Sequence, residues 1–391
     1  MPPPPPPPPL SDELVEEILL RIPPDEPELL VRAALACKHW GRLVSCPGFR
    51  RRFRERHRTP PLLGVLRSFR SSDGCGTTRF APTCSFRPRR TDRRGWEAVD
   101  CRHGRVLLQR EPRSSQSDSV FLQVKPRSSK SGGVLAVWDP ITDELRELPE
   151  APQFLNRHRS NGAVLCAAID CDHLDCSCGH FLVVLVVTDQ RTTFSSYVYS
   201  SDANAWSEPT SVPYRDFLST DRAALAGNAV YFLLFTTARI LKYDLGTRQM
   251  TVLQGPSMSR NRIQLMTAVG GGLGCAMMKG SRLYLWSSEA GPSREMAWSQ
   301  TRVIEFEKLV PTNHVWKSFD VLGFVDGGGI VYLQTADGCF TTDLKSGQSK
   351  KVRGASSVCN TIPYMSFYTP VFGATFAGKG PRADDSLPSQ T

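Results

Sequence analysis

A ten-residue stretch, CDHLDCSCGH at residues 171–180, concentrates side chains that bind transition metals. Its thiols belong to Cys171, Cys176 and Cys178, and its imidazoles to His173 and His180. These are ligand types that Zn²⁺ prefers, but structural zinc sites usually pair them as Cys-x2-Cys or His-x3-His, and no second pair follows at a suitable distance. Because the stretch lies between two apolar runs typical of strands, we expect a surface loop. A metal site is the alternative, and we assign no metal ligand.

Other motifs that could carry chemistry lack the context it requires. VGGGLG at residues 269–274 is rich in glycine, but a run typical of a strand follows it where a phosphate-binding loop would open a helix, so we interpret it as a turn. His103 in DCRHGRV has no nucleophile or carboxylate partner assignable from spacing, which favours a histidine at a strand end. Gly-x-Ser-x-Gly, His-Glu-x-x-His and Gly-Lys-Ser/Thr are absent from the sequence. We therefore expect no catalytic residue, no cofactor and no enzymatic activity.

Positive charge gathers in one stretch. Residues 50–94 contain fourteen arginines and three acidic residues, which gives this stretch a net charge of +11. The whole chain carries +10, so the remaining residues together carry about −1. Four phenylalanines lie among these arginines and could stack on bases while the arginines contact phosphates: Phe53, Phe69, Phe80 and Phe86. Arginines on a helix usually form a solvated face, however, so the weaker alternative is a nucleic-acid-binding protein or a β-propeller scaffold.

Length and composition indicate a globular protein of two or three domains, with 391 residues and 40% hydrophobic content. The sequence does not open with the charged and apolar pattern of a secretory signal, and its longest apolar run, FLVVLVV at 181–187, is far shorter than the ~20 residues that span a bilayer. Twelve cysteines at irregular spacings fit a reducing compartment. We expect a cytoplasmic or nuclear protein without a membrane segment.

Short helices are expected in residues 10–58, after a polyproline stretch. Ser11 is a plausible N-cap, apolar residues then repeat at a spacing of four from Leu10, and Pro23 ends the first helix. A second helix would run from Asp25 to Trp40, and a third would begin near residue 45. Three such helices make a poor core of their own, and an exposed patch of leucines with a tryptophan is the usual mark of a partner surface.

The order of residues in LSDELVEEILLRIPPDEPELLVRAALACKHW, residues 10–40, closely resembles the F-box. It departs from that family's pattern at Ser11, where proline is usual, and at His39, where arginine is common. The resemblance implies docking on the SKP-type adaptor of a cullin-RING ubiquitin ligase. The residues that we expect to bind the adaptor are Leu10, Leu14, Ile18, Leu19, Leu30, Cys37 and Trp40.

From about residue 60 the apolar period changes from four to two, and a recurring element appears: a strand, an aspartate, a polar turn and another strand. Its aspartates are Asp139, Asp202, Asp244 and Asp343, and RLYLWSS at 282 with EMAWSQTRV at 295 supplies a further unit with a longer turn. Repeats of this size favour a β-propeller of six or seven blades, with a pair of β-sandwiches as the alternative. The aspartates are expected to start tight turns and not to act in catalysis.

The stretches TPPLLGVLRSF, RFAPTCSFRP, WEAVDCRHGRVLL, VWDPITDELRELP and CDHLDC, in that order, resemble plant F-box proteins with a C-terminal F-box-associated propeller. We therefore expect an α+β multidomain chain: a disordered tail at 1–9, a three-helix F-box at 10–58, the propeller-like domain at 60–377 and a disordered tail at 378–391. The resemblance implies the substrate-recognition subunit of an SKP-cullin-F-box ligase, which holds an unknown protein substrate while other subunits carry out catalysis.

Overall fold

The computed structural model of the chain describes residues 10–70, 76–110, 133–151, 160–168, 171–174, 176, 179–189, 193–256, 263–268, 270–290, 296–305, 320–324, 329–335, 337–352 and 361–370. The chain divides into two compact units, Met1–Thr59 with Tyr368–Thr391, and Pro60–Phe367. Both tails predicted to be disordered, and the predicted domain end at residue 377, lie outside the described residues.

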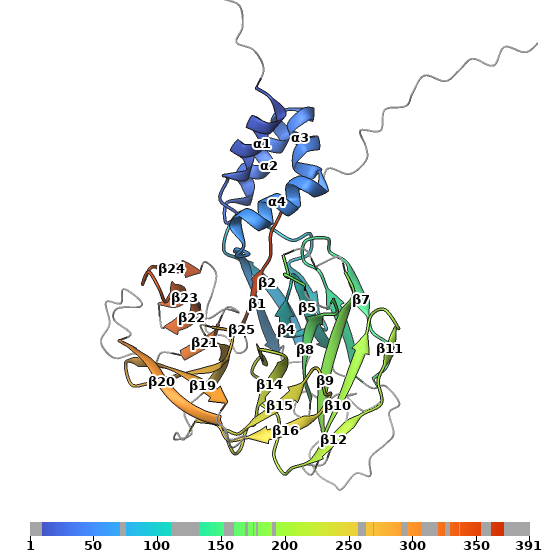
Figure 1. Ribbon diagram of the computed structural model, residues 1–391, viewed down its shortest axis with the longest axis vertical. Helices are drawn as coiled ribbons and strands as arrows, with labels where there is room; N and C mark the ends of the chain where they lie inside the picture. The colour runs from blue at the N-terminus through green and yellow to red at the C-terminus, as the bar shows by residue number, and fades with distance from the viewer. Residues whose placement is uncertain are drawn as a thin grey trace, which may run out of the picture. The chain divides into compact units, whose positions relative to one another are not determined.

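The first unit contains four helices where the sequence predicted three (Figure 1). The predicted second helix is interrupted at Cys37, whose backbone is extended at φ −154° and ψ 159°, and whose Sγ accepts the backbone N–H of Trp40 at 3.4 Å. An extended residue cannot continue a helix, so the chain ends one helix and caps the next. The helices are α1 (Asp12–Leu20), α2 (Pro27–Ala36), α3 (Lys38–Ser45) and α4 (Pro47–His57). No helix in the described part of the chain is long and apolar enough to cross a membrane.

A small apolar core holds the four helices together. In α4, Phe53 stacks on Phe49 with ring centroids 6.0 Å apart and meets His57 edge-on with centroids 4.6 Å apart. His57 Nε2 lies 3.1 Å from the carbonyl oxygen of Leu20. This contact ties the end of α4 to the end of α1. The buried apolar residues of the unit are Val15, Leu19, Leu20, Leu30, Ala34, Val44, Phe49 and Phe53.

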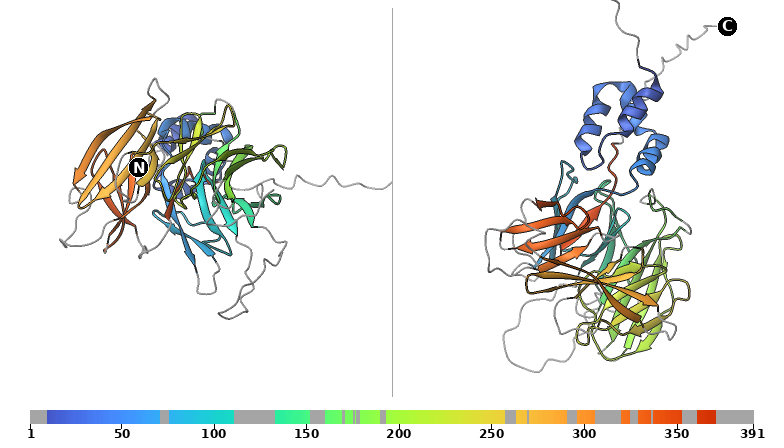
Figure 2. Two further views of the ribbon diagram at one scale, coloured as in Figure 1. Left: turned by 90° about the horizontal axis from the view of Figure 1, so that it is seen from below. Right: turned by 60° about the vertical axis from the view of Figure 1, so that its left-hand side comes forward.

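The second unit is a six-bladed β-propeller, within the predicted range of six or seven blades (Figures 1 and 2). Each blade is an antiparallel sheet of at least four strands. The four strands follow sequence order except in the first blade, where β25 precedes β1, and in the third blade a further strand, β12, pairs with β10. Blades 1 to 3 comprise β1 (Leu62–Arg70), β2 (Gly76–Pro82), β3 (Asp92–Arg94) and β25 (Thr361–Met365); β4 (Glu97–Arg102), β5 (Arg105–Arg110), β6 (Val134–Trp138) and β7 (Leu145–Glu147); and β8 (Ser160–Cys166), β9 (Phe181–Asp189), β10 (Thr193–Ser200), β11 (Ala205–Trp206) and β12 (Thr210–Pro213).

Blades 4 to 6 repeat the same order of strands. They comprise β13 (Ala224–Ala226), β14 (Ala229–Leu233), β15 (Ile240–Asp244) and β16 (Met250–Leu253); β17 (Ile263–Thr267), β18 (Leu273–Lys279), β19 (Arg282–Ala290) and β20 (Met296–Glu305); and β21 (Asp320–Phe324), β22 (Ile330–Thr335), β23 (Gly338–Asp343) and β24 (Ser349–Val352). The long hairpin of β19 and β20 is the unit that the sequence predicted between the third and fourth aspartates.

The last strand of the propeller closes the ring. β25 pairs with β1 in register from Gly64 opposite Tyr364 to Leu66 opposite Ile362, so the first blade combines the two ends of the unit. Gly64 is required there because a Cβ atom would lie 2.3 Å from the ring of Phe80. Non-covalent strand pairing thus closes the propeller.

The hydrophobic core lies between neighbouring blades, because each sheet buries both of its faces. In β9, residues 183–188 are all buried, as a strand covered on both sides requires. The predicted alternative of a sandwich pair is wrong, since six sheets share their faces around one ring. Apolar side chains of neighbouring blades pack in common clusters. Leu107 packs with Val183 between blades 2 and 3, and Val184 with Phe232 between blades 3 and 4. The other pairs are Ile240 with Cys275 between blades 4 and 5, Leu283 with Val331 between blades 5 and 6, and Val65 with Tyr332 between blades 6 and 1.

Aspartates start the turns between the third and fourth strands of three blades, as the sequence predicted. Oδ1 of Asp343 accepts the backbone N–H groups of the residues two and three positions on at 2.7 and 2.9 Å, Asp244 does the same at 3.2 and 3.0 Å, and Oδ1 of Asp139 accepts one at 2.8 Å. The prediction for Asp202 is wrong: the equivalent position is Ser200, directly opposite Ala205 in the strand register. The repeat is displaced there by two residues, because Ser200 Oγ accepts a turn N–H in place of a carboxylate.

Two of these aspartates are expected to contribute to stability in opposite pH directions. Hydrogen bonds, the largest from the backbone N–H of Ser346, lower the pKa of Asp343 from its ordinary 3.8. The stability that Asp343 contributes is therefore complete above pH 3.8 and is lost as pH falls through the lowered pKa. Burial raises the pKa of Asp139, so stability there falls as pH rises through the raised value. As pH rises from the lowered pKa of Asp343 to 3.8, Asp343→Asn should lose stability relative to wild type. As pH rises from 3.8 to the raised pKa of Asp139, Asp139→Asn should gain stability relative to wild type. Urea midpoints measured over an acid pH series test this, and shifts of the same sign in both variants would contradict it.

Candidate functional site

An apolar stripe runs along the exposed face of α1. Leu14 and Ile18 lie four residues apart, which places them on one face of the helix, and they are 55% and 52% exposed. Leu10, which precedes the helix, is 57% exposed. On α2, Leu29 and Leu35 are 38% and 66% exposed. Exposed apolar side chains on so small a unit are typical of surfaces that bind other proteins. We call Leu10, Leu14 and Ile18 the apolar face.

The other residues predicted to bind the adaptor differ in their surroundings. Leu19 and Leu30 are each only 1% exposed and belong to the core, Cys37 is exposed, and Trp40 is half-buried. Leu19 and Leu30 therefore position the helices. The sequence reasoning did not include the exposed leucines of α2, Leu29 and Leu35, although the place of Leu35 off the buried stripe of α2 was a signal for its exposure.

Ion pairs within the protein neutralise much of the basic stretch. On α4, Arg52 forms an ion pair with Glu16 of α1, and Arg56 lies 3.3 Å from Glu17. In the first blade, Arg79 donates to both carboxylate oxygens of Asp92 at 2.8 and 3.1 Å. Three of the four phenylalanines proposed for base stacking are buried, namely Phe53, Phe80 and Phe86, and buried rings cannot stack on bases. The pattern favours intramolecular roles for these residues.

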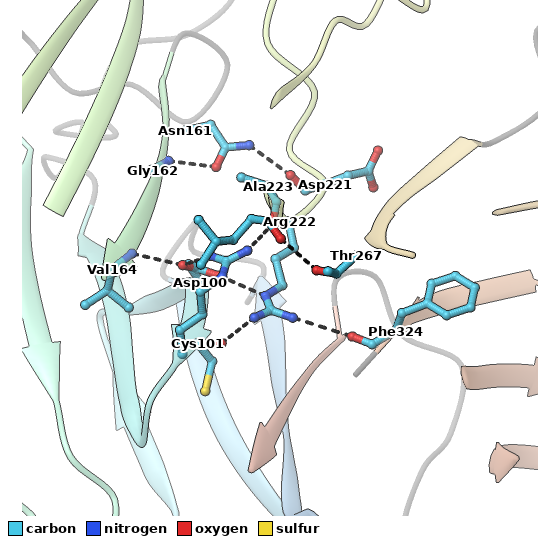
Figure 3. A network of polar contacts seen from close by, with 12 residues as sticks. Asp100, Cys101, Asn161, Gly162, Val164, Asp221, Arg222, Ala223, Thr267 and Phe324 are labelled. Atoms are coloured by element: carbon cyan, nitrogen blue, oxygen red, sulfur yellow. Dashed lines mark hydrogen bonds and ion pairs between the residues drawn. The ribbon is translucent and has the colours of Figure 1, made fainter. Parts of the chain in front are cut away.

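A buried carboxylate, that of Asp100, belongs to a network of polar contacts in the propeller (Figure 3). Asp100 of β4 is fully buried, forms an ion pair with Arg102, and accepts the Nε–H of Arg222 at 2.8 Å. It also accepts the backbone N–H of Val164 in β8 at 2.9 Å. A buried charge is tolerated only when it is paired and hydrogen-bonded, and Asp100 meets both conditions. Its partners come from blades 2 and 3 and from the segment before β13.

Arg222 extends this network across the ring. Its Nη2 donates to the carbonyl oxygen of Cys101 in blade 2 at 2.5 Å, and its Nη1 to that of Phe324 in blade 6 at 3.5 Å. Next to it, Asn161 of blade 3 donates to the carbonyl oxygen of Asp221 at 2.9 Å (Figure 3). These bonds fasten the inner strands of several blades to one segment, residues 219–223.

A cavity adjoins this network between blades 1, 4, 5 and 6. Its volume is about 20 Å³, which accommodates about one water molecule. Polar groups at its wall include Asp221, Gln264 and Thr267, with Gln264 Nε2 donating to Asp221 Oδ1 at 3.1 Å. We assign the network and its cavity to holding the blades together and not to binding a ligand.

The metal-binding residue types of the first motif meet at one point. The ligand atoms of Cys166, Cys171, His173 and Cys176 all lie within 4.8 Å of one another. Cys166, the last residue of β8, was missed because it lies outside the motif, and only the fold brings it in. Burial, followed by the neighbouring thiols of Cys166 and Cys171, raises the pKa of Cys176 to about 12.

The remaining residues of the motif lie elsewhere. His180 Nε2 is 3.6 Å from Asp202 at an exposed position, and Cys178 lies outside the described residues. His103 occupies the β4–β5 turn with φ 53°, which confirms its placement at a strand end. The glycines of the predicted turn at 269–274 connect β17 to β18, with Gly270 at φ 100°, and this interpretation is confirmed.

Comparison with known proteins finds solved structures of only remote likeness. No curated protein matches this sequence. Similar solved structures include a protein from Lactobacillus plantarum, 12% identical over 76% of this chain and 83% of that chain, with a TM-score of 0.40. Another is a protein from Desulfotomaculum acetoxidans, 9% identical over 77% of this chain and 89% of that chain, with a TM-score of 0.41. Likeness at this level carries no argument about function.

A family model described as "F-box protein AT5G49610-like, beta-propeller" matches residues 97–372. The match begins at the first residue of β4 and includes blades 2 to 6 together with the closing strand β25. The matched residues make up well over half of the chain, and their architecture is the one the family's description names. The chain therefore belongs to the AT5G49610-like β-propeller family of F-box proteins.

Proposed function

We propose that the protein is the substrate-recognition subunit of an SKP-cullin-F-box ubiquitin ligase. The observation that carries this proposal is the apolar face, with Leu14 and Ile18 exposed on α1 and Leu10 exposed just before it. The resemblance of residues 10–40 to the F-box gives that face a partner, the SKP-type adaptor. Membership of an F-box propeller family supports the same assignment.

In this role the protein acts by position. The helical unit binds the adaptor, the propeller binds a protein substrate, and the two together keep a substrate lysine near the charged ubiquitin carrier. Tethering replaces a rare encounter in solution by a local one at high effective concentration. Catalytic groups would belong to other subunits, so this chain would be a non-catalytic receptor, and we propose the cytoplasm or nucleus as its location.

Adaptor binding tests the proposal. Leu14→Asp with Ile18→Asp places two charges where we propose an apolar interface, and we expect binding of a purified SKP-type adaptor by the full-length chain to fall at least about 100-fold, since each buried charge costs at least about 1.4 kcal/mol, a factor of about ten. Titration by calorimetry measures the effect. The melting temperature should stay unchanged, because both side chains are more than half exposed.

A matched control is Phe235→Asp, which alters an apolar side chain that is 75% exposed on the propeller. This variant should bind the adaptor as wild type does. Leu30→Asp is expected to lose binding together with the folding of the helical unit, because that side chain belongs to the core. The proposal fails if wild type does not bind any SKP-type adaptor, or if Leu14→Asp with Ile18→Asp binds equally well.

A further inference from the structure

Four potential metal ligands converge where blade 3 begins. Cys166 ends β8, and Cys171, His173 and Cys176 belong to the connection between β8 and β9, here called the β8–β9 loop (residues 167–180). All four ligand atoms lie within 4.8 Å of one another, and Cys176 Sγ is 3.8 Å from His173 Nδ1. The sequence spacing is Cys-x4-Cys-x-His-x2-Cys, which differs from the paired spacings of common zinc modules.

These separations fit a tetrahedral ion. Zn²⁺ bound at ~2.3 Å to sulfur and ~2.0 Å to nitrogen places its ligand atoms about 3.5–3.8 Å apart. The separation of Cys176 Sγ from His173 Nδ1 already has this value, and the upper limit of 4.8 Å for the set requires a contraction of only about 1 Å. Three thiols and one imidazole form a soft donor set, which favours Zn²⁺ over Mg²⁺ or Ca²⁺.

The surroundings of the cluster support bound thiolates. The backbone N–H of Ala168 donates to Cys166 Sγ, and that of His173 to Cys171 Sγ, each at 3.4 Å. Such N–H contacts to sulfur stabilise negative charge on the ligand. Three thiolates around one Zn²⁺ would give the site a net charge of about −1. The positive guanidinium of Arg105 lies close by and donates to the carbonyl oxygen of Cys176 at 2.7 Å.

The β4–β5 turn holds the same loop in place. Arg105 also donates to the carbonyl oxygen of Gly179, and the ring of His103 lies 4.2 Å from that of His173. Backbone at φ 57° sets the direction of the His173 side chain. The cluster thus lies where a loop of blade 3 meets a turn of blade 2.

We infer that Cys166, Cys171, His173 and Cys176 form a structural Cys₃His zinc site that fastens the β8–β9 loop. Four protein ligands leave no open coordination position, so the ion serves structure and does not act on a substrate. The inference does not depend on adaptor binding, because no residue of the helical unit takes part.

Metal content and ligand geometry test the site directly. The full-length chain, purified in reducing buffer without chelator, is expected to contain about one zinc ion per chain by elemental mass spectrometry. Replacing the ion with Co²⁺ should give the intense visible bands of tetrahedral cobalt and the near-ultraviolet charge-transfer band of cobalt bound to thiolate. Removing the ion with a chelator should lower the melting temperature.

Matched variants separate ligands from bystanders. Cys171→Ser and His173→Ala are expected to lose the zinc, whereas His173→Cys should retain it with a stronger thiolate charge-transfer band. His180→Ala, a histidine of the same loop, and Cys84→Ser, a half-buried thiol of blade 1, should keep the full zinc content. Retention by His173→Cys guards against the possibility that the other variants lose zinc by misfolding.

Three outcomes would overturn the inference. The first is a folded wild-type chain without zinc that also gives no tetrahedral cobalt spectrum. The second is equal loss of zinc in His180→Ala and in His173→Ala. A third is a disulfide between cluster cysteines, detected by mass spectrometry after alkylation under denaturing conditions, since a disulfide removes two of the ligands.

Discussion

Replacing Asp100 with alanine is expected to lower the free energy of unfolding of the propeller by about 3–5 kcal/mol. The carboxylate is fully buried, and Arg102 beside it is only 1% exposed in its side chain. Removing Asp100 leaves that guanidinium buried without its counter-ion and deprives Arg222 and the backbone N–H of Val164 of an acceptor. The cost of one uncompensated buried charge exceeds that of most core substitutions.

Chemical denaturation followed by tryptophan fluorescence measures this loss, because Trp138 is fully buried in blade 2. Asp202→Ala provides the control: its carboxylate is 77% exposed and 3.6 Å from an exposed histidine, so it should change stability by less than about 1 kcal/mol. A loss below about 1 kcal/mol for Asp100→Ala would show that water replaces the carboxylate, and the network would then not hold the blades.

A chain that ends at residue 360 is expected to fail to form a cooperative propeller. It lacks β25, so β1 loses the partner that pairs with residues 62–67, and the first blade loses its inner strand. The same truncation removes Tyr364, a fully buried side chain that donates to the carbonyl oxygen of Gly104 at 3.2 Å and packs against Phe80. Exposing these surfaces outweighs the few kilocalories per mole of net stability that a domain has.

Calorimetry and near-ultraviolet circular dichroism test this expectation. The matched control is a chain that ends at residue 370, which keeps every described element, including β25. It should melt as the full chain does. A cooperative transition of normal enthalpy in the chain that ends at 360 would mean that the other strands close the ring without β25.

The period of the apolar residues was sufficient to predict helices before residue 58 and paired strands after residue 60. It failed at particular places for physical reasons. Cys37 interrupts a helical pattern because its sulfur caps the next helix. The spacing of apolar residues carries no information about such a cap. Asp202 was wrongly predicted to start its turn, because Ser200 accepts the turn hydrogen bond two residues earlier. The strand register, and not the residue type, determines which residue starts the turn.

The candidate sites were less predictable because they depend on long-range contacts. Leu19 and Leu14 are both apolar residues of α1, and only the packing of the other helices shows that one is buried and the other exposed. Asp100 meets Arg222 across 122 positions of sequence, which no local spacing reveals. Cys166 joins the metal-binding residue types because β8 ends beside the β8–β9 loop.

The pairing of β25 with β1 also sets an order of events during synthesis. The first residues of β1 leave the ribosome about 300 residues before their partners in β25, which at ~5–20 residues per second is a delay of about 15–60 s. During this time β1 has an unpaired edge, a template for wrong pairing, and the contact that finally covers it spans nearly the whole unit. The four helices are complete by residue 57, contact one another over short sequence separations, and can fold early in that delay. A nascent chain therefore presents its apolar face to partners well before its propeller can close.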